Sequence, residues 1–121
     1  MAIQNKYDLE ERTAKFGEAI IALCKKLRRN AITDPLVNQL IRSGTSVGAN
    51  YMEANGASSK RDFINKIFIC KKEAQESKHW LRMLASCKLD GMDSDIRRLW
   101  KEGQELTLIF QKIASSSRSK I

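Results

Sequence analysis

The sequence predicts an all-α fold, an up-down-up-down four-helix bundle with left-handed packing. One proline and six glycines among 121 residues leave little material for the turns of a β-sheet. Apolar residues recur at alternating steps of three and four in four separate segments, which is the period of an amphipathic helix. Short turn signals separate these segments, so we expect consecutive helices to lie antiparallel.

We expect a single domain over residues 1–114, followed by a frayed basic tail at 115–121. The tail is predicted to fray because Ser115–Lys120 contains no apolar residue. The four helices are predicted at about 8–30, 34–57, 59–88 and 94–115.

Capping residues and cations mark the two ends of the first predicted helix. Asp8 and Glu11 have capping-box spacing, which predicts a helix start at Asp8. The apolar stripe that follows has one polar position, Thr13, and consists of Leu9, Phe16, Ile20, Leu23 and Leu27. Four cations end the segment, where positive charge stabilises the negative end of the helix dipole: Lys25, Lys26, Arg28 and Arg29.

The second predicted helix contains two interior glycines, Gly44 and Gly48. Its start signal is Thr33-Asp34-Pro35, a capping residue followed by proline at the first helical position. Each interior glycine costs about 1 kcal/mol relative to alanine. We therefore expect a neighbouring helix to approach closely at this point.

The third predicted helix opens at Ser58 or Ser59 and is apolar around most of its circumference in its first half. A single partner helix cannot cover that much surface, so the helix either occupies the middle of the bundle or also faces another subunit. Asp93 or Ser94 caps the fourth helix. We predict that an oligomer interface includes Gly44, Gly48, Ile64 and Phe68.

The charge and the cysteines limit the classes of partner and compartment. A net charge of +8 attracts polyanions, acidic proteins or an anionic membrane surface. The three cysteines are too widely spaced for a disulfide framework or a zinc pattern, so we expect reduced core thiols at Cys24, Cys70 and Cys87. No apolar run resembles a signal core or a membrane span, which predicts a cytoplasmic protein without a membrane partner.

The positive charge is concentrated in the second half of the chain. Residues 1–57 have a net charge of +2, and residues 58–121 have a net charge of +6. A basic stripe on the third helix is predicted to contact nucleic acid, with two cations a quarter-turn further round; together they are Lys60, Arg61, Lys71, Lys72, Lys78 and Arg82. On the fourth helix, we expect Arg98–Glu102 and Lys101–Glu105 to neutralise one another.

Three motifs over about 50 residues carry a family resemblance. The first is Ser-Val-x-x-Asn-x-x-Glu at Ser46–Glu53, and the second is Ser-Lys-x-Asp-Phe-Ile at Ser59–Ile64. The third is Lys-Glu-Ala-x-Glu-Ser-x-x-Trp-Leu at Lys72–Leu81. In this order they resemble the 23S rRNA intervening-sequence proteins, also called four helix bundle proteins. Ala54 stands where many members have glycine.

This resemblance implies an up-down bundle that assembles into a ring, typically a homopentamer. It also implies association with nucleic acid, because members look like nucleic-acid-associated proteins and a distant relative accompanies a reverse transcriptase. The resemblance implies no catalysis.

Several carboxylates and the single histidine are candidates for metal binding or acid–base chemistry. Glu76 and His79 have the Glu-x-x-His spacing of di-iron bundles, but a second pair is impossible with one histidine. We therefore predict no metal, no cofactor and no catalytic residue. Glu53, Glu73 and Glu76 could instead converge between the second and third helices, either for acid–base chemistry or, as we favour, for a structural or interface role.

Within that structural role, we expect Glu53 to pair with a cation such as Lys60 or Lys72, or to form a buried polar contact beside Asn50 that fixes helix register. The aromatics Phe63, Trp80, Trp100 and Phe110 are interpreted as packing residues. The sequence therefore predicts a non-enzymatic homo-oligomer that binds RNA or DNA without base specificity. The alternative is an adaptor that recognises an acidic partner protein.

Overall fold

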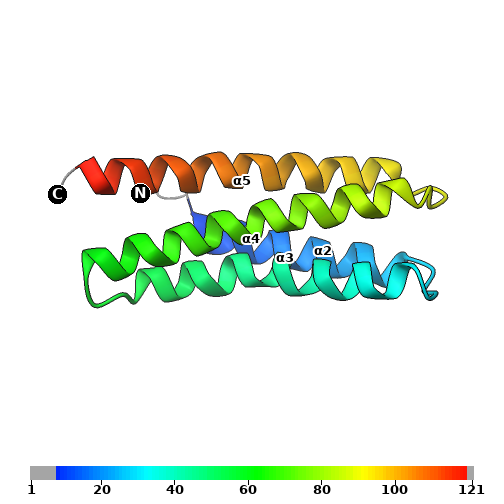
Figure 1. Ribbon diagram of the computed structural model, residues 1–121, viewed down its shortest axis with the longest axis horizontal. Coiled ribbons are helices and arrows are strands. Elements are labelled where there is room, and N and C mark those ends of the chain that lie inside the picture. The colour runs from blue at the N-terminus through cyan, green and yellow to red at the C-terminus, as the bar shows by residue number, and fades with distance from the viewer. Residues whose placement is uncertain (1–7, 120–121) are drawn as a thin grey trace.

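A computed structural model describes residues 8–119, and over that range the protein consists of four α-helices and no strands. The helices, shown in Figure 1, are α2 (Leu9–Lys26), α3 (Thr33–Asn55), α4 (Lys60–Ser86) and α5 (Asp93–Ser119). Each helix packs against the next one in the chain, and the connections alternate between the two ends of the bundle. The first and last helices, α2 and α5, have a much smaller contact.

Side-chain caps position two of the helix starts as the sequence predicts. The Glu11 backbone N–H donates to Asp8 Oδ1 at 3.1 Å before α2. The Asp62 N–H donates to Ser59 Oγ at 3.0 Å before α4. These side-chain oxygens satisfy backbone donors that a helix start leaves without an internal partner.

The end of α2 differs from the predicted boundary. The helix stops at Lys26 instead of residue 30, because Leu27 is extended, with ψ 140°. A separate turn follows, in which Asn30 Oδ1 accepts from the backbone N–H groups of Ile32 and Thr33 at 2.8 and 2.9 Å. The cap of α3 therefore comes from Asn30, and α3 already begins at Thr33.

The four helices bury a continuous apolar core. Phe16 and Ile20 of α2 share this core with large buried residues of the other helices, among them Val37, Leu40, Ile67, Leu81, Leu84, Leu106 and Phe110. The core also contains polar contacts, among them a hydrogen bond from Ser77 Oγ to Ser43 Oγ at 2.9 Å. Packing of α4 against both α3 and α5 explains why α4 is apolar around most of its circumference.

The two interior glycines of α3 permit close contact with α2 in the same subunit. A Cβ atom on Gly44 would lie 2.9 Å from Ile20 Cγ1, and one on Gly48 would lie 3.2 Å from Thr13 Oγ1. Close approach is confirmed, but Gly44 is buried inside the bundle, and Ile64 is only 7 % exposed. This burial corrects the prediction that these two residues face another subunit, whereas Gly48 and Phe68 remain half-exposed.

The helix α5 continues to Ser119, so the predicted frayed tail is wrong for residues 115–119. Gln111 Nε2 donates to Ser115 Oγ at 3.0 Å, and the Arg118 guanidinium lies 5.4 Å from the centre of the Phe68 ring. These contacts and the buried Ala114 stabilise the last turns. Residues 120–121 of the predicted tail lie outside the described residues.

The cysteines are free thiols, as the sequence predicts. Burial raises the pKa of Cys24 to about 11 and that of Cys70 to about 12, because a thiolate loses hydration inside the core. Cys87 is half-buried near the end of α4. At neutral pH the two buried cysteines are therefore protonated packing residues.

Candidate nucleic-acid interface

Two cations of the predicted stripe, Lys71 and Lys78, lie at the contact between α4 and α5. Lys71 Nζ donates to Gln111 Oε1, and Lys78 Nζ donates to Gln104 Oε1. Lys78 Nζ also lies 4.8 Å from the centre of the Trp100 ring. Their partners are neutral, and neither lysine forms an ion pair with a carboxylate within residues 8–119.

The stripe is too long to form one site. Lys60 and Arg61 begin α4 and Arg82 stands near its end, which at 1.5 Å per residue separates them by about 32 Å. Lys72 is exposed and makes no ion pair within residues 8–119. The structure therefore brings Lys71, Lys78 and Arg82 to the α5 side of α4, and it leaves Lys60, Arg61 and Lys72 elsewhere on α4.

Cations of α5 complete the group around Arg82. A groove of about 480 Å³ lies between the end of α4 and the start of α5. Four cations line it, and none of them forms an ion pair within the part of the chain that the structure describes: Arg82, Lys88, Arg97 and Lys101. We call these four residues the α4–α5 basic surface.

Lys101 lacks an ion-pair partner within residues 8–119 because an arginine of α2 binds the carboxylate that the sequence assigned to it. Arg12 donates to both Glu102 oxygens at 2.8 Å and to Glu105 Oε1 at 2.7 Å. Hydrogen bonding to Glu102 raises the pKa of the Arg12 guanidinium above its ordinary value. The expected pairs Arg98–Glu102 and Lys101–Glu105 are therefore wrong, because Arg12 occupies both carboxylates.

Arg98 pairs with a carboxylate, whereas Arg97 and Lys101 form no ion pair within residues 8–119. Arg98 Nη2 lies 3.3 Å from Asp95 Oδ1, and Lys26 Nζ lies 2.8 Å from Asp95 Oδ2. The hydrogen bond from Lys26 lowers the pKa of Asp95 most, and the hydrogen bond from Arg98 lowers it further. Asp95 therefore neutralises part of the positive charge at this end of the bundle.

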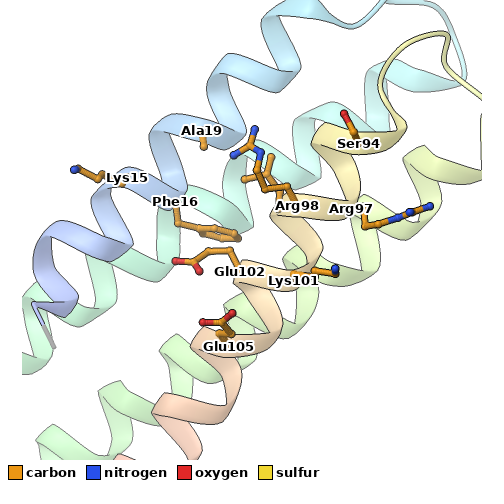
Figure 2. Close-up of a pocket in the computed structure, with 10 residues that line it drawn as sticks. Lys15, Phe16, Ala19, Ser94, Arg97, Arg98, Lys101, Glu102 and Glu105 are labelled. Atoms are coloured by element: carbon orange, nitrogen blue, oxygen red, sulfur yellow. The ribbon is translucent and has the colours of Figure 1, made fainter. Parts of the chain in front are cut away.

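A second groove, of about 660 Å³, opens between α2 and α5 (Figure 2). Lys15 and Phe16 line it from α2, and Arg97 and Lys101 border it from α5. In Figure 2 these last two side chains extend to the side of α5 that is turned away from α2. Arg97 and Lys101 therefore border both grooves and connect them over the outer face of α5.

One aromatic residue differs from the prediction that all four are packing residues. Phe110 is fully buried, and Phe63 and Trp80 are half-buried against the core. Trp100, however, is 38 % exposed and lines the α4–α5 groove. Its ring is thus available to a ligand, because Trp100 lies about 100° round the helix from the buried Leu99 and so stands off the apolar stripe that faces the core.

The predicted acidic residues occupy the contact between α3 and α4. Arg42 Nη2 lies 3.3 Å from Glu73 Oε1 and 2.5 Å from Glu76 Oε1, and Glu73 is only 7 % exposed. The hydrogen bond to Glu73 is the largest cause that raises the pKa of Arg42. A single guanidinium therefore binds Glu73 and Glu76, and Glu53 is not part of this cluster.

Glu53 and Asn50 do not form the predicted buried contact. Glu53 is an exposed side chain that pairs with Lys66 at 2.7 Å, in place of Lys60 or Lys72. Asn50 Nδ2 donates to the Ser46 carbonyl of its own helix at 2.9 Å. Glu73 is the buried carboxylate of the contact between α3 and α4, and sequence reasoning missed its partner Arg42 because the two residues are 31 positions apart.

The described residues contain neither a metal-binding cluster nor a membrane-spanning helix. Over residues 8–119, no group of three or more His, Cys, Asp or Glu side chains could hold a metal ion. The His79 ring stacks edge-on against Trp80 with centroids 4.8 Å apart. None of the described helices has the length and apolar character that crossing a membrane requires.

Helix order, core and charge distribution define a small all-α bundle with one basic end. The sequence matches the family described as 23S rRNA-intervening sequence protein over residues 5–112, and the chain belongs to this family. The fold is similar to that of a crystallised protein of unknown function from the S23 ribosomal protein family of Bacteroides thetaiotaomicron. That similarity has a TM-score of 0.75 and 29 % sequence identity, and it covers 87 % of this chain and 96 % of the other. No curated protein matches the sequence.

Proposed function

We propose that this protein is a non-enzymatic, homo-oligomeric bundle that binds RNA or DNA through the α4–α5 basic surface without reading base sequence. The observation that carries the proposal is the group of four cations around one groove, none of them paired with a carboxylate within residues 8–119. Unpaired cations bind phosphates and release condensed counterions, so they contribute affinity that is independent of sequence.

The proposal is tested by measuring affinity for oligonucleotides of several sequences as salt is raised. We expect a steep fall in affinity with salt and similar values for every sequence. The double variant Arg97→Gln/Lys101→Gln should weaken binding by about tenfold, as expected when two phosphate contacts are lost. The matched control Lys25→Gln/Lys112→Gln removes the same charge from exposed positions outside both grooves and should bind like wild type.

The adaptor alternative predicts the opposite preference on the same surface. An acidic protein presents carboxylates, so polyglutamate of equal charge should then compete with an oligonucleotide at lower concentration. Stronger binding of polyglutamate, or equal loss of affinity in both double variants, would contradict nucleic-acid binding at this surface.

We also propose that copies of the chain assemble into a ring, with five subunits as the family resemblance implies. A groove between α2 and α3, which shares no lining residue with the α4–α5 basic surface, supports this as a subunit contact that leaves the basic surface open; four carboxylates line it: Asp8, Glu10, Glu11 and Glu18. Ile21 and Met52 border the same groove and are 41 % and 60 % exposed. A contact between two different surfaces repeats head to tail and closes into a ring when the rotation allows.

Light scattering tests the assembly. We expect a mass that is a multiple of the 13.8 kDa chain, and a smaller mass for Met52→Lys, which places a charge beside the groove. A wild-type mass of one chain would contradict the ring.

A further inference from the structure

The groove between α4 and α5 has an aromatic wall in addition to its cations. Trp100 is 38 % exposed, and beside it lie the buried Leu81 and Ile96 and the half-buried Ala85. The lining residues come from the end of α4, the start of α5 and the turn that joins these two helices at one end of the bundle (Figure 1). An apolar floor with an exposed indole ring can hold a flat, apolar group.

Cations surround this wall on both helices. Arg97 and Lys101 are three residues before and one residue after Trp100, so at about 100° per residue both lie on the same side of it, toward the outer face of α5. Arg82 and Lys88 border the groove from the end of α4, where the backbone of Lys88 has a positive φ of 57°. The carboxylate that lines the groove is Asp93, at its edge at the first residue of α5.

One cation also lies against the ring itself. Lys78 Nζ is 4.8 Å from the centre of the Trp100 ring, within the range of a cation–π contact. This contact and the hydrogen bond to Gln104 hold the ammonium beside the groove. The groove therefore combines an aromatic face with cations spaced around it, which is the combination that binds single-stranded nucleic acids.

We propose that Trp100 stacks on an unpaired base in this groove while the α4–α5 basic surface binds the neighbouring phosphates, so that single-stranded RNA or DNA is the preferred ligand. The inference rests on the proposed nucleic-acid binding and adds to it a preference for single-stranded over double-stranded ligands. Bases inside a duplex are already stacked on one another and present no free face to the indole. Every base has a π-face, so this contact favours single strands without selecting a sequence.

The first test measures fluorescence of Trp100 in a Trp80→Phe background. Trp80 Nε1 is buried and has no hydrogen-bond partner within the described structure, so phenylalanine removes a donor that nothing there accepts. We expect a 15-residue oligo(dT) or oligo(U) to quench Trp100. Heparin, a polyanion without bases, should bind without this quenching.

The second test compares affinities for single strands and for duplexes of equal length. Trp100→Leu keeps an apolar side chain at an exposed position and should weaken single-strand binding about tenfold, the usual scale of one base–aromatic contact. Duplex binding should change by less than about twofold, because phosphate contacts alone support it. Trp100→Phe keeps an aromatic ring and should restore most of the single-strand affinity.

The outcomes separate this inference from the proposed function. Equal affinity for single strands and duplexes, or equal quenching by heparin and oligo(dT), would overturn base stacking and leave phosphate binding in place. Loss of single-strand and duplex binding to the same extent in Trp100→Leu would also overturn it. Binding of no oligonucleotide at low salt would overturn both proposals.

Discussion

The helix α4 presents charged residues to both α3 and α5, and these residues form ion pairs on the α3 side but none on the α5 side within residues 8–119. Toward α3, Glu73 and Glu76 bind Arg42, and Lys66 binds Glu53, so positive and negative charges cancel. Toward α5, Lys78 meets a glutamine and a tryptophan, and Arg82 has no ion-pair partner within residues 8–119. The unpaired cations of α4 that line a groove therefore lie on its α5 side.

The difference depends on where the carboxylates of α5 point. Glu102 and Glu105 stand at the spacing that could neutralise Arg98 and Lys101 of their own helix. Instead, both bind Arg12 of α2, across the smallest helix contact of the bundle. One arginine on a different helix thus determines how much positive charge α5 exposes.

The largest expected effect comes from neutralising the whole α4–α5 basic surface. Changing Arg82, Lys88, Arg97 and Lys101 together to glutamine should lower affinity for a single strand by at least about 100-fold at low salt. The slope of log affinity against log salt should become shallower by about 3, since each lost phosphate contact contributes about 0.7. Fluorescence anisotropy over a salt series measures both quantities.

The side of α4 that faces α3, where the charged residues form ion pairs, supplies the control for this variant. Arg42→Gln/Lys66→Gln also removes positive charge, but from side chains that already bind carboxylates. We expect its affinity to stay within about threefold of wild type, because these exposed pairs contribute little to the field at the groove. A loss as steep as that of the quadruple variant would show that total charge, not its placement, determines binding.

The second effect concerns how much the ion pair between α3 and α4 stabilises the protein. Arg42→Ala leaves the nearly buried Glu73 carboxylate without its cation and should lower the free energy of unfolding by about 1–2 kcal/mol, less than for a fully buried pair since Arg42 is half-exposed. Urea denaturation measures this change. Glu73→Gln added to Arg42→Ala should recover part of the loss. An unchanged urea midpoint in Arg42→Ala would contradict a stabilising role for this pair.

A smaller effect tests the link between α2 and the basic surface. Arg12→Gln frees Glu102 and Glu105, which can then pair with Arg98 and Lys101 on α5. We expect nucleic-acid affinity to fall about threefold, the scale of one or two surface ion pairs, although Arg12 borders neither groove. Restored affinity in Arg12→Gln/Glu102→Gln/Glu105→Gln would assign the loss to the released carboxylates.

The smallest effect is a pH dependence at Asp95. Its pKa is lowered in the folded protein, so its ionised form stabilises the fold above the ordinary aspartate pKa, and this contribution is lost as pH falls through the lowered value. Asp95→Asn should therefore lower the urea midpoint slightly at pH 7, and the difference from wild type should disappear as the pH falls below the lowered pKa, where wild-type Asp95 is protonated. A difference that stays the same as the pH falls would contradict this assignment.

Local signals were sufficient for the helices and for two of their caps. Asp8 and Ser59 cap as predicted, because the cap and the amide it binds are three residues apart in the chain. The end of α2 was predicted four residues too late, because its cations continue past Lys26 while Asn30 and Thr33 build a turn that periodicity does not show. The continuation of α5 to Ser119 depends on packing against Phe68, which lies about 50 residues earlier.

The candidate site was predicted less completely. The sequence identified Lys78 and Arg82, but it treated Lys101 as neutralised and Trp100 as a packing residue. It also placed Gly44 at a subunit interface, whereas its missing Cβ makes room for Ile20 of the same bundle. These errors share one cause, since each depends on a partner from another helix.

The sequence by itself determined the fold class, the four helices and the concentration of positive charge in the second half of the chain, because helix period and composition are local properties. Only the tertiary structure decided which charges remain free. Ion pairs form between atoms within about 4 Å of each other, and in this bundle residues such as Arg12 and Glu102 reach that distance across 90 positions of sequence. The basic surface therefore results from helix packing, which brings partners together for some cations and leaves Arg97 and Lys101 without an ion-pair partner among residues 8–119.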